Sequence, residues 1–215
     1  MKKFIFALCA LFMLGSYFNV ETVSAKDSED GLSKSELKDY KKLSKTRAKE
    51  LTKAGWVCDG ESRTLEATLF EHYKRMAEEG LKEQTGVCDK SKKRSIGVSR
   101  AIWNAQTSYV SEMSADIKGR TGSITNVDDD IESDKFYEAF EKCMRADVSG
   151  LFDEPSYIIS RKKGKDYEFR VVYLYNKAKA AALKKSALEN AAKEVQMSKA
   201  VMNEISKFIE EGQSE

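Results

Sequence analysis

The stretch SIGVSRAIWNAQTSYVSEMSADI, from Ser95 to Ile117, decides how this chain folds. Its apolar side chains recur every three or four residues, at Val98, Ile102, Ala105, Tyr109, Val110, Met113 and Ile117. Side chains at this spacing share one face of an α-helix, so the stretch predicts a helix with one buried face. Segments typical of strands flank it. We therefore expect an α+β fold in which helices pack on a small antiparallel sheet of three to four strands.

The clearest strand pattern lies C-terminal to this helix. Residues 156–161 and 166–175 flank the short, glycine-containing segment 162–165, which predicts a β-hairpin. Further helices are expected over residues 35–54, 65–79 and 176–211, and from Ser133 onward. We divide the chain into a signal peptide (1–25), a polar linker with a surface helix (26–55), an α+β core domain (56–176) and a long C-terminal helix (177–215).

The C-terminal helix carries a seven-residue repeat. Its apolar positions are Ala181, Leu188, Val195, Met202 and Ile209. A repeat of seven predicts a narrow apolar seam on one side of the helix. One interpretation is that the helix lies back along its own domain. The other is self-association, in which residues 181–209 pair with a second chain.

The first 25 residues have the organisation of a signal peptide. Lys2 and Lys3 precede the apolar run 4–14, and Val23-Ser24-Ala25 supplies small residues for cleavage. The run is too short to span a bilayer, and no span is expected in the mature chain. We expect an exported protein that is periplasmic, associated with the outer envelope, or secreted. Cys9 lies inside the apolar run, so it does not fit a lipid-modified cysteine.

Export matters for the cysteines because disulfides persist in oxidising compartments. Two of them have matching neighbours, in Val57-Cys58-Asp59 and Val87-Cys88-Asp89. We expect these to be extended segments lying side by side, and this makes Cys58 and Cys88 a candidate disulfide. The alternative is two reduced cysteines in similar contexts. Cys143 lies on the inner stripe of its helix and is expected to be a buried, inert thiol.

Charge is balanced over the whole chain, with 37 basic and 35 acidic residues. This balance argues against a dedicated nucleic-acid-binding protein. Two local clusters stand out: Lys90, Lys92, Lys93 and Arg94 before the central helix, and Arg161, Lys162, Lys163 and Lys165 at the hairpin turn. If both clusters lie at one end of the fold, they form a patch for an anionic partner, either anionic lipid at a membrane surface or surface polysaccharide. The alternative is two solvated loops.

The sequence predicts no catalytic residue, no cofactor and no metal site. The single histidine, His72, has no second histidine at ligand spacing, so a structural role is expected. A calcium loop beginning at Asp128 would need glycine at its sixth and glutamate at its twelfth position, where Ser133 and Ala139 stand. A hydrolase that uses a pair of carboxylates stays an alternative, although no particular pair is indicated.

Three segments carry a family resemblance: RAKELTKAGW at 47–56, SRAIWNA at 99–105 and RVVYLYN at 170–176. Together they resemble a group of uncharacterised exported bacterial proteins that is distantly similar to the twenty-kilodalton Lpp-type envelope lipoproteins. The resemblance covers most of residues 45–185. It implies helices packed on an antiparallel sheet and a place in the cell envelope, and it implies no functional residue. We expect a non-catalytic binding or structural module that contacts an envelope component or a protein partner.

Overall fold

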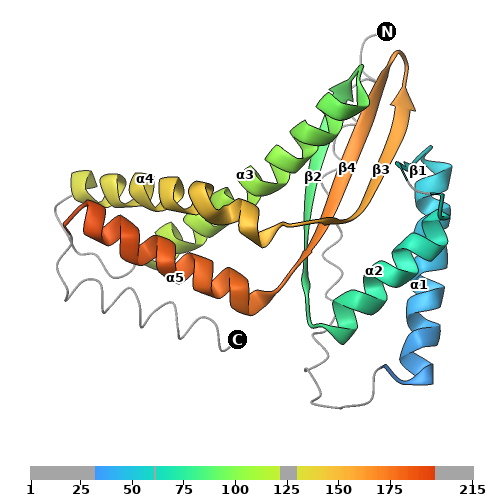
Figure 1. Ribbon diagram of the computed structural model, residues 1–215, viewed down its shortest axis with the longest axis horizontal. Coiled ribbons are helices and arrows are strands. Elements are labelled where there is room, and N and C mark those ends of the chain that lie inside the picture. The colour runs from blue at the N-terminus through green and yellow to red at the C-terminus, as the bar shows by residue number, and fades with distance from the viewer. Residues whose placement is uncertain (1–31, 61, 122–129, 197–215) are drawn as a thin grey trace, which may run out of the picture. The chain divides into compact units, whose positions relative to one another are not determined.

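The computed structural model describes residues 32–60, 62–121 and 130–196. Its elements in chain order are α1 (Lys34–Lys53), β1 (Val57–Cys58), α2 (Leu65–Glu78), β2 (Lys82–Ser91), α3 (Arg94–Thr121), α4 (Asp130–Asp147), the short 3-10 helix η1 (Val148–Leu151), β3 (Pro155–Lys163), β4 (Asp166–Tyr175) and α5 (Lys177–Glu194) (Figure 1). The predicted signal peptide and the acidic segment around Asp128 lie outside the described residues.

The described strands form one four-stranded antiparallel sheet with the order β1-β3-β4-β2. This confirms the predicted α+β class and the antiparallel sheet. The predicted hairpin is β3 and β4, whose pairing runs to Lys163 and Asp166. Gly164 closes the turn at a φ of +65°, a left-handed conformation that favours glycine.

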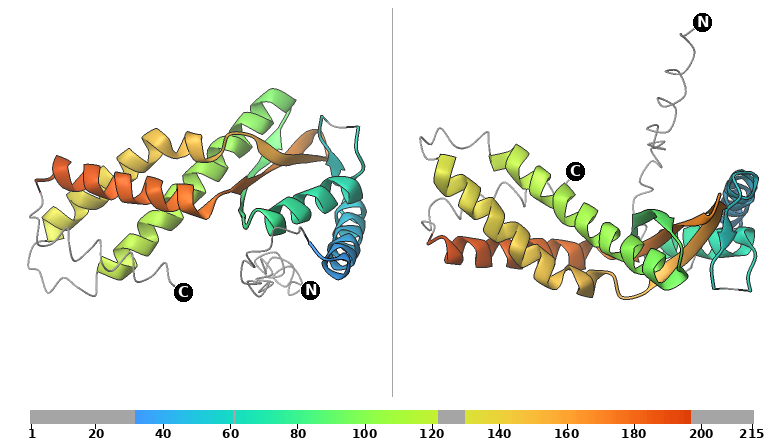
Figure 2. Two further views of the ribbon diagram at one scale, coloured as in Figure 1. Left: turned by 60° about the horizontal axis from the view of Figure 1, so that its bottom comes forward. Right: turned by 90° about the horizontal axis from the view of Figure 1, so that it is seen from above.

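The two faces of the sheet are covered by different helices. Phe169, Val171 and Tyr173 alternate along β4 and face a core shared with α3, α4 and α5. Val172, between them, joins Tyr157 and Ile159 in a second core with α1, α2 and Trp56. Successive residues of a strand point to opposite faces, so β4 is buried on both sides. Both views in Figure 2 show α4 and α5 packed together, away from α1 and α2.

Helix α3 lies directly against the backbone of β2. A Cβ added to Gly86 would stand 2.6 Å from the amide nitrogen of Ala105, and closer still to the carbonyl oxygen of Ala101. Both alanines are fully buried. Side-chain hydrogen bonds hold the same contact, from Asn104 Nδ2 to the Val87 carbonyl (2.6 Å) and from Gln84 Nε2 to the Ala105 carbonyl (3.4 Å). The alanine spacing of the central helix therefore serves close packing on a glycine.

The candidate disulfide between Cys58 and Cys88 is wrong for this structure. The two strands lie at opposite edges of the sheet, about 14 Å apart at ordinary strand spacing, whereas a disulfide needs Cα atoms within about 7 Å. The side chains of the two cysteines also point to opposite faces of the sheet. The row Cys58–Ile159–Arg170–Val87 points toward α1 and α2, so Cys88 points the other way, toward α3. All three described cysteines are free.

Cys143, expected to be buried, is only partly so. It packs against the core under α4 and α5. Burial, and then the nearby carboxylate of Glu194, raise the pKa of its thiol. A raised thiol pKa lowers the thiolate fraction, in keeping with an unreactive cysteine.

Helix α5 packs along its own chain. Its buried positions against α4 and the core include Ala180, Ala187, Leu188, Ala191 and Ala192. On the same face, Lys184 Nζ reaches Asp116 Oδ2 of α3 at 2.5 Å. The helix ends at Glu194 and Gln196 has a φ of +56°, so the described helix is shorter than the predicted 176–211. Met202 and Ile209 of the predicted seam lie outside the described residues.

We expect Gly86→Ala to lower the free energy of unfolding by about 3 kcal/mol, the upper end for overpacking, because the new methyl group meets helix backbone that cannot swing aside. Urea denaturation measures this. The matched control is Gly119→Ala in α3, where a Cβ meets nothing within 4 Å and better helix propensity should add up to about 1 kcal/mol. Equal stability of Gly86→Ala and the wild type would contradict the close contact.

Candidate anion-binding surface

The sheet register brings the two basic clusters to one end of the fold. Ser91 at the end of β2 pairs with Tyr167 of β4, and Tyr167 pairs with Lys162 of β3. Helix α3 begins three residues after Ser91, beside the same strand ends (Figure 1). We call the set Lys90, Lys92, Lys93, Arg94, Arg161, Lys162, Lys163 and Lys165 the basic end. The structure therefore meets the geometric condition that the sequence analysis set for an anionic-partner patch.

Four of these eight cations form ion pairs. Lys90 Nζ lies 3.7 Å from Asp166 Oδ2, and Arg94 Nε lies 2.7 Å from Asp59 Oδ2. Arg161 and Lys163 share Glu168. The other four, Lys92, Lys93, Lys162 and Lys165, are exposed and have no ion-pair partner among the described residues. With Asp89 included, four carboxylates stand against eight cations, so this end keeps a positive excess.

Glu168 organises the interior of this end. It is 4% exposed, and its carboxylate accepts hydrogen bonds from Arg161 Nε and, at 2.7 Å, from Lys163 Nζ. Burial alone would raise its pKa, but these two donors hold the pKa of Glu168 below its usual value. Arg161 and Glu168 stand directly opposite each other in the hairpin. Cross-strand neighbours of opposite charge stabilise a hairpin, so the pair follows from the register.

Trp56, in the second core, packs against two arginines of the hairpin. The guanidinium carbons of Arg161 and Arg170 lie 4.8 and 4.5 Å from the centre of its ring, a cation–π arrangement. The Nε of Arg170 is buried without a hydrogen-bond partner in the described part of the chain. Burial, and then repulsion from Arg161 and Arg47, lower the pKa of Arg170. Trp56 thus contacts one arginine from each strand of the hairpin, on the face of the sheet that α1 and α2 cover.

A second polar cluster lies at the opposite end of the sheet. His72 of α2 is 1% exposed, with Nδ1 at 2.8 Å from Ser156 Oγ and Nε2 at 2.8 Å from Glu83 Oε2. The rings of Tyr73 and Tyr157 meet its imidazole edge to face, at 5.4 and 5.0 Å between centres. Burial would raise the pKa of Glu83, but the hydrogen bond from His72 lowers it below its usual value. Both imidazole nitrogens are satisfied, as a structural histidine requires.

In this cluster hydrogen bonds link a hydroxyl, an imidazole and a carboxylate in series. When ionised Glu83 accepts the Nε2 proton, Nδ1 is left to accept a hydrogen bond from the Ser156 hydroxyl. The two aromatic rings cover the imidazole, and the two hydrogen bonds tie α2 to β3 through Ser156 and to β2 through Glu83. His72 stands out in the sequence, but Ser156 and Glu83 do not, because neither partner lies at a spacing that local patterns reveal.

No metal site emerges from the described residues, which hold no cluster of three histidine, cysteine or acidic side chains suited to bind an ion. Nor does any helix within the described ranges combine the length and apolar character of a membrane span.

Glu168→Gln should lower the free energy of unfolding by about 2 kcal/mol at neutral pH, because it replaces a buried charge-assisted contact by a neutral one. The pKa of Glu168 is lower in the folded state, so its stabilisation is complete above the unfolded value of about 4.3 and is lost as pH falls through the folded value. Urea denaturation across this range should therefore show the wild type and the variant converging in acid.

The control for that experiment is Glu154→Gln, an exposed glutamate just before β3. This variant should match the wild type at every pH. A Glu168→Gln variant that is as stable as the wild type at neutral pH would show that the carboxylate does not organise the hairpin.

His72→Leu should cost about 3 kcal/mol of stability, because it removes two hydrogen bonds and leaves the Ser156 hydroxyl and the Glu83 Oε2 atom without their imidazole partner. Ser156→Ala should cost only about 1 kcal/mol, since one neutral hydrogen bond is lost. Thermal denaturation of both variants measures the difference. Two variants of wild-type stability would rule out the structural role of this cluster.

Known proteins add no identification. No protein-family model matches the chain, and no curated protein and no solved structure matches it. The resemblance of segments 47–56, 99–105 and 170–176 to envelope lipoproteins therefore stays a prediction.

Proposed function

We propose that this protein is an exported, non-catalytic binding module that attaches to an anionic component of the cell envelope through its basic end. One observation carries the proposal. Two cationic clusters, far apart in the sequence, come together where β2 and β3 end and β4 begins, and four of their lysines have no acidic partner within the described residues. The formal net charge of the whole chain is only +2, so this positive charge is local.

The paired and unpaired cations have different roles in this proposal. Arg161, Lys163 and Arg94 are held by Glu168 and Asp59 and keep the strand ends in place. The four exposed lysines provide attraction that reaches about 8–10 Å into the solvent at physiological salt. A surface of this kind concentrates near a polyanion without needing an enclosed pocket.

Export is proposed from residues 1–25, with the periplasm, the outer envelope or the medium as destination. The alternative of a self-associating scaffold gains no support from the described part of α5. Leu188 and Ala191, which would belong to the seam or its second row, are buried against the protein's own core. Self-association through the seam would therefore have to use its other positions, of which Met202 and Ile209 lie outside the described ranges.

The test uses the chain without residues 1–25 and a variant that carries Lys92→Glu, Lys93→Glu, Lys162→Glu and Lys165→Glu. Dextran sulfate is the polyanion probe. Each lysine near an anionic surface is worth about 1 kcal/mol, so the fourfold variant should bind about 700-fold more weakly or worse. Wild-type binding should weaken steadily as salt is added, which isothermal titration can follow.

The matched control reverses four exposed lysines of α1, namely Lys38, Lys41, Lys42 and Lys45. It changes net charge by the same amount, away from the basic end. Retained binding in the control and lost binding in the first variant support the proposal. Equal losses would mean that only net charge matters, and this outcome would reject a defined binding surface.

A further inference from the structure

Exposed apolar side chains gather beside the basic end. Among the described residues the exposed large hydrophobic side chains are Leu43, Val57, Ile96, Trp103 and Tyr167. Ile96 and Trp103, 45% and 61% exposed, belong to the first three turns of α3, which starts within the basic end. Tyr167, 40% exposed, lies at the hairpin end.

Packing contacts connect these side chains through the core. A Cβ added to Gly97 of α3 would meet the Phe169 ring and, at 3.0 Å, the Ser91 side chain. The Phe169 and Tyr167 rings lie 6.3 Å apart, and Tyr167 pairs with Ser91. The first turn of α3, the end of β2 and the hairpin end therefore lie next to one another, so the exposed side chains of all three segments belong to the same end of the fold.

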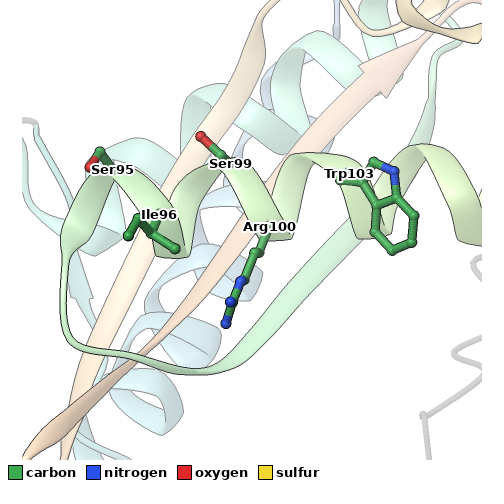
Figure 3. A pocket seen from close by; sticks show the side chains of 5 residues that line it. All are labelled: Ser95, Ile96, Ser99, Arg100 and Trp103. Atoms are coloured by element: carbon green, nitrogen blue, oxygen red, sulfur yellow. The ribbon is translucent and has the colours of Figure 1, made fainter.

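The exposed side of α3 is open rather than enclosed. Ser95, Ile96, Ser99, Arg100 and Trp103 line a shallow hollow, and all five come from this one helix (Figure 3). Ile96, Arg100 and Trp103 follow each other at spacings of four and three, which puts them on one stripe. A site for a small molecule would surround its ligand from several elements. This surface instead suits contact with something broad and flat.

We infer that the anionic partner of the basic end is a lipid bilayer, on which Ile96, Trp103 and Tyr167 enter the headgroup region while the exposed lysines of the basic end contact lipid phosphates. The inference rests on the proposed function and names its ligand. Trp and Tyr favour the membrane–water interface because one end of each ring system is apolar and the other polar. Lys and Arg reach around apolar side chains to keep their charge at the headgroups.

Charge and apolar contact support each other in this arrangement. A cation near an anionic leaflet strengthens binding about fivefold, and the effect falls off within the screening length. Apolar insertion adds a contribution that salt does not screen. Ile96 favours lipid over a polysaccharide, because an isoleucine gains from an apolar environment but cannot stack on a sugar as an aromatic ring can.

The chain contains its own probe for this test. It has two tryptophans, of which Trp56 is 2% exposed and Trp103 is 61% exposed. Residues 26–215 are mixed with vesicles made of equal parts phosphatidylglycerol and phosphatidylcholine. We expect the emission of Trp103 to shift to the blue and to be quenched when the acyl chains are brominated near the headgroup. Trp103→Phe, which leaves Trp56 as the sole emitter, should show neither change.

A double variant separates lipid insertion from charge. Ile96→Ala with Trp103→Ala should weaken vesicle binding by about tenfold or more, because apolar contact is lost. Binding to dextran sulfate should stay unchanged, and a wild-type thermal denaturation curve shows that the variant is folded. Leu43→Ala is the control, since Leu43 is 41% exposed on α1, and it should bind vesicles like the wild type.

The outcomes distinguish this inference from the proposed function. Dextran sulfate binding without any Trp103 response to vesicles would overturn the bilayer and leave an anionic polysaccharide as partner. Vesicle binding that is insensitive to the double variant would overturn the insertion of Ile96 and Trp103. Binding to neither probe would reject the proposed function together with the inference.

Discussion

The structure depends on the contact between the backbone of α3 and the backbone of β2. Gly86 has no side chain, and the two residues that face it, Ala101 and Ala105, have the smallest side chains a helix can use without glycine. This short distance lets Asn104 and Gln84 bridge helix and strand with hydrogen bonds. It also sets the height at which α3 lies over Phe169, Val171 and Tyr173, and thus the thickness of the core that α4 and α5 complete.

The direct connection from β2 into α3 also determines where the basic residues meet. Because α3 starts directly after β2, its first turn must lie at the same end of the sheet as the β3–β4 turn. The cations that precede α3 and those of the hairpin therefore meet, although no local signal in either segment requires it. Glu168, buried between Arg161 and Lys163, keeps the hairpin end compact despite its charge density. The surface chemistry of this end is thus a product of the fold's connectivity.

The sequence predicted those features that local patterns determine. The hairpin around Gly164 and the helices came from periodicity and turn chemistry, which act over a few residues. Strand order depends on packing between distant segments, and the prediction that the Cys58 and Cys88 segments lie side by side was wrong. Cys58 and Cys88 have similar neighbours, yet two strands lie between them. His72 was recognised without Ser156 and Glu83 for the same reason, and exposed Trp103 looked like any other residue of a helix.

The free thiols allow local unfolding of the protein to be followed by their reactivity. Cys58 is partly buried and lies beside Thr68 on the face of the sheet that α1 and α2 cover, whereas Cys88 is buried in the core under α3, α4 and α5. Each face of the sheet thus contains its own cysteine. Proteins open locally in cooperative units, and a buried thiol becomes reactive only when its unit opens. Cys88 can therefore report when the layer of α3, α4 and α5 opens, with the partly exposed Cys58 on the other face as an internal comparison.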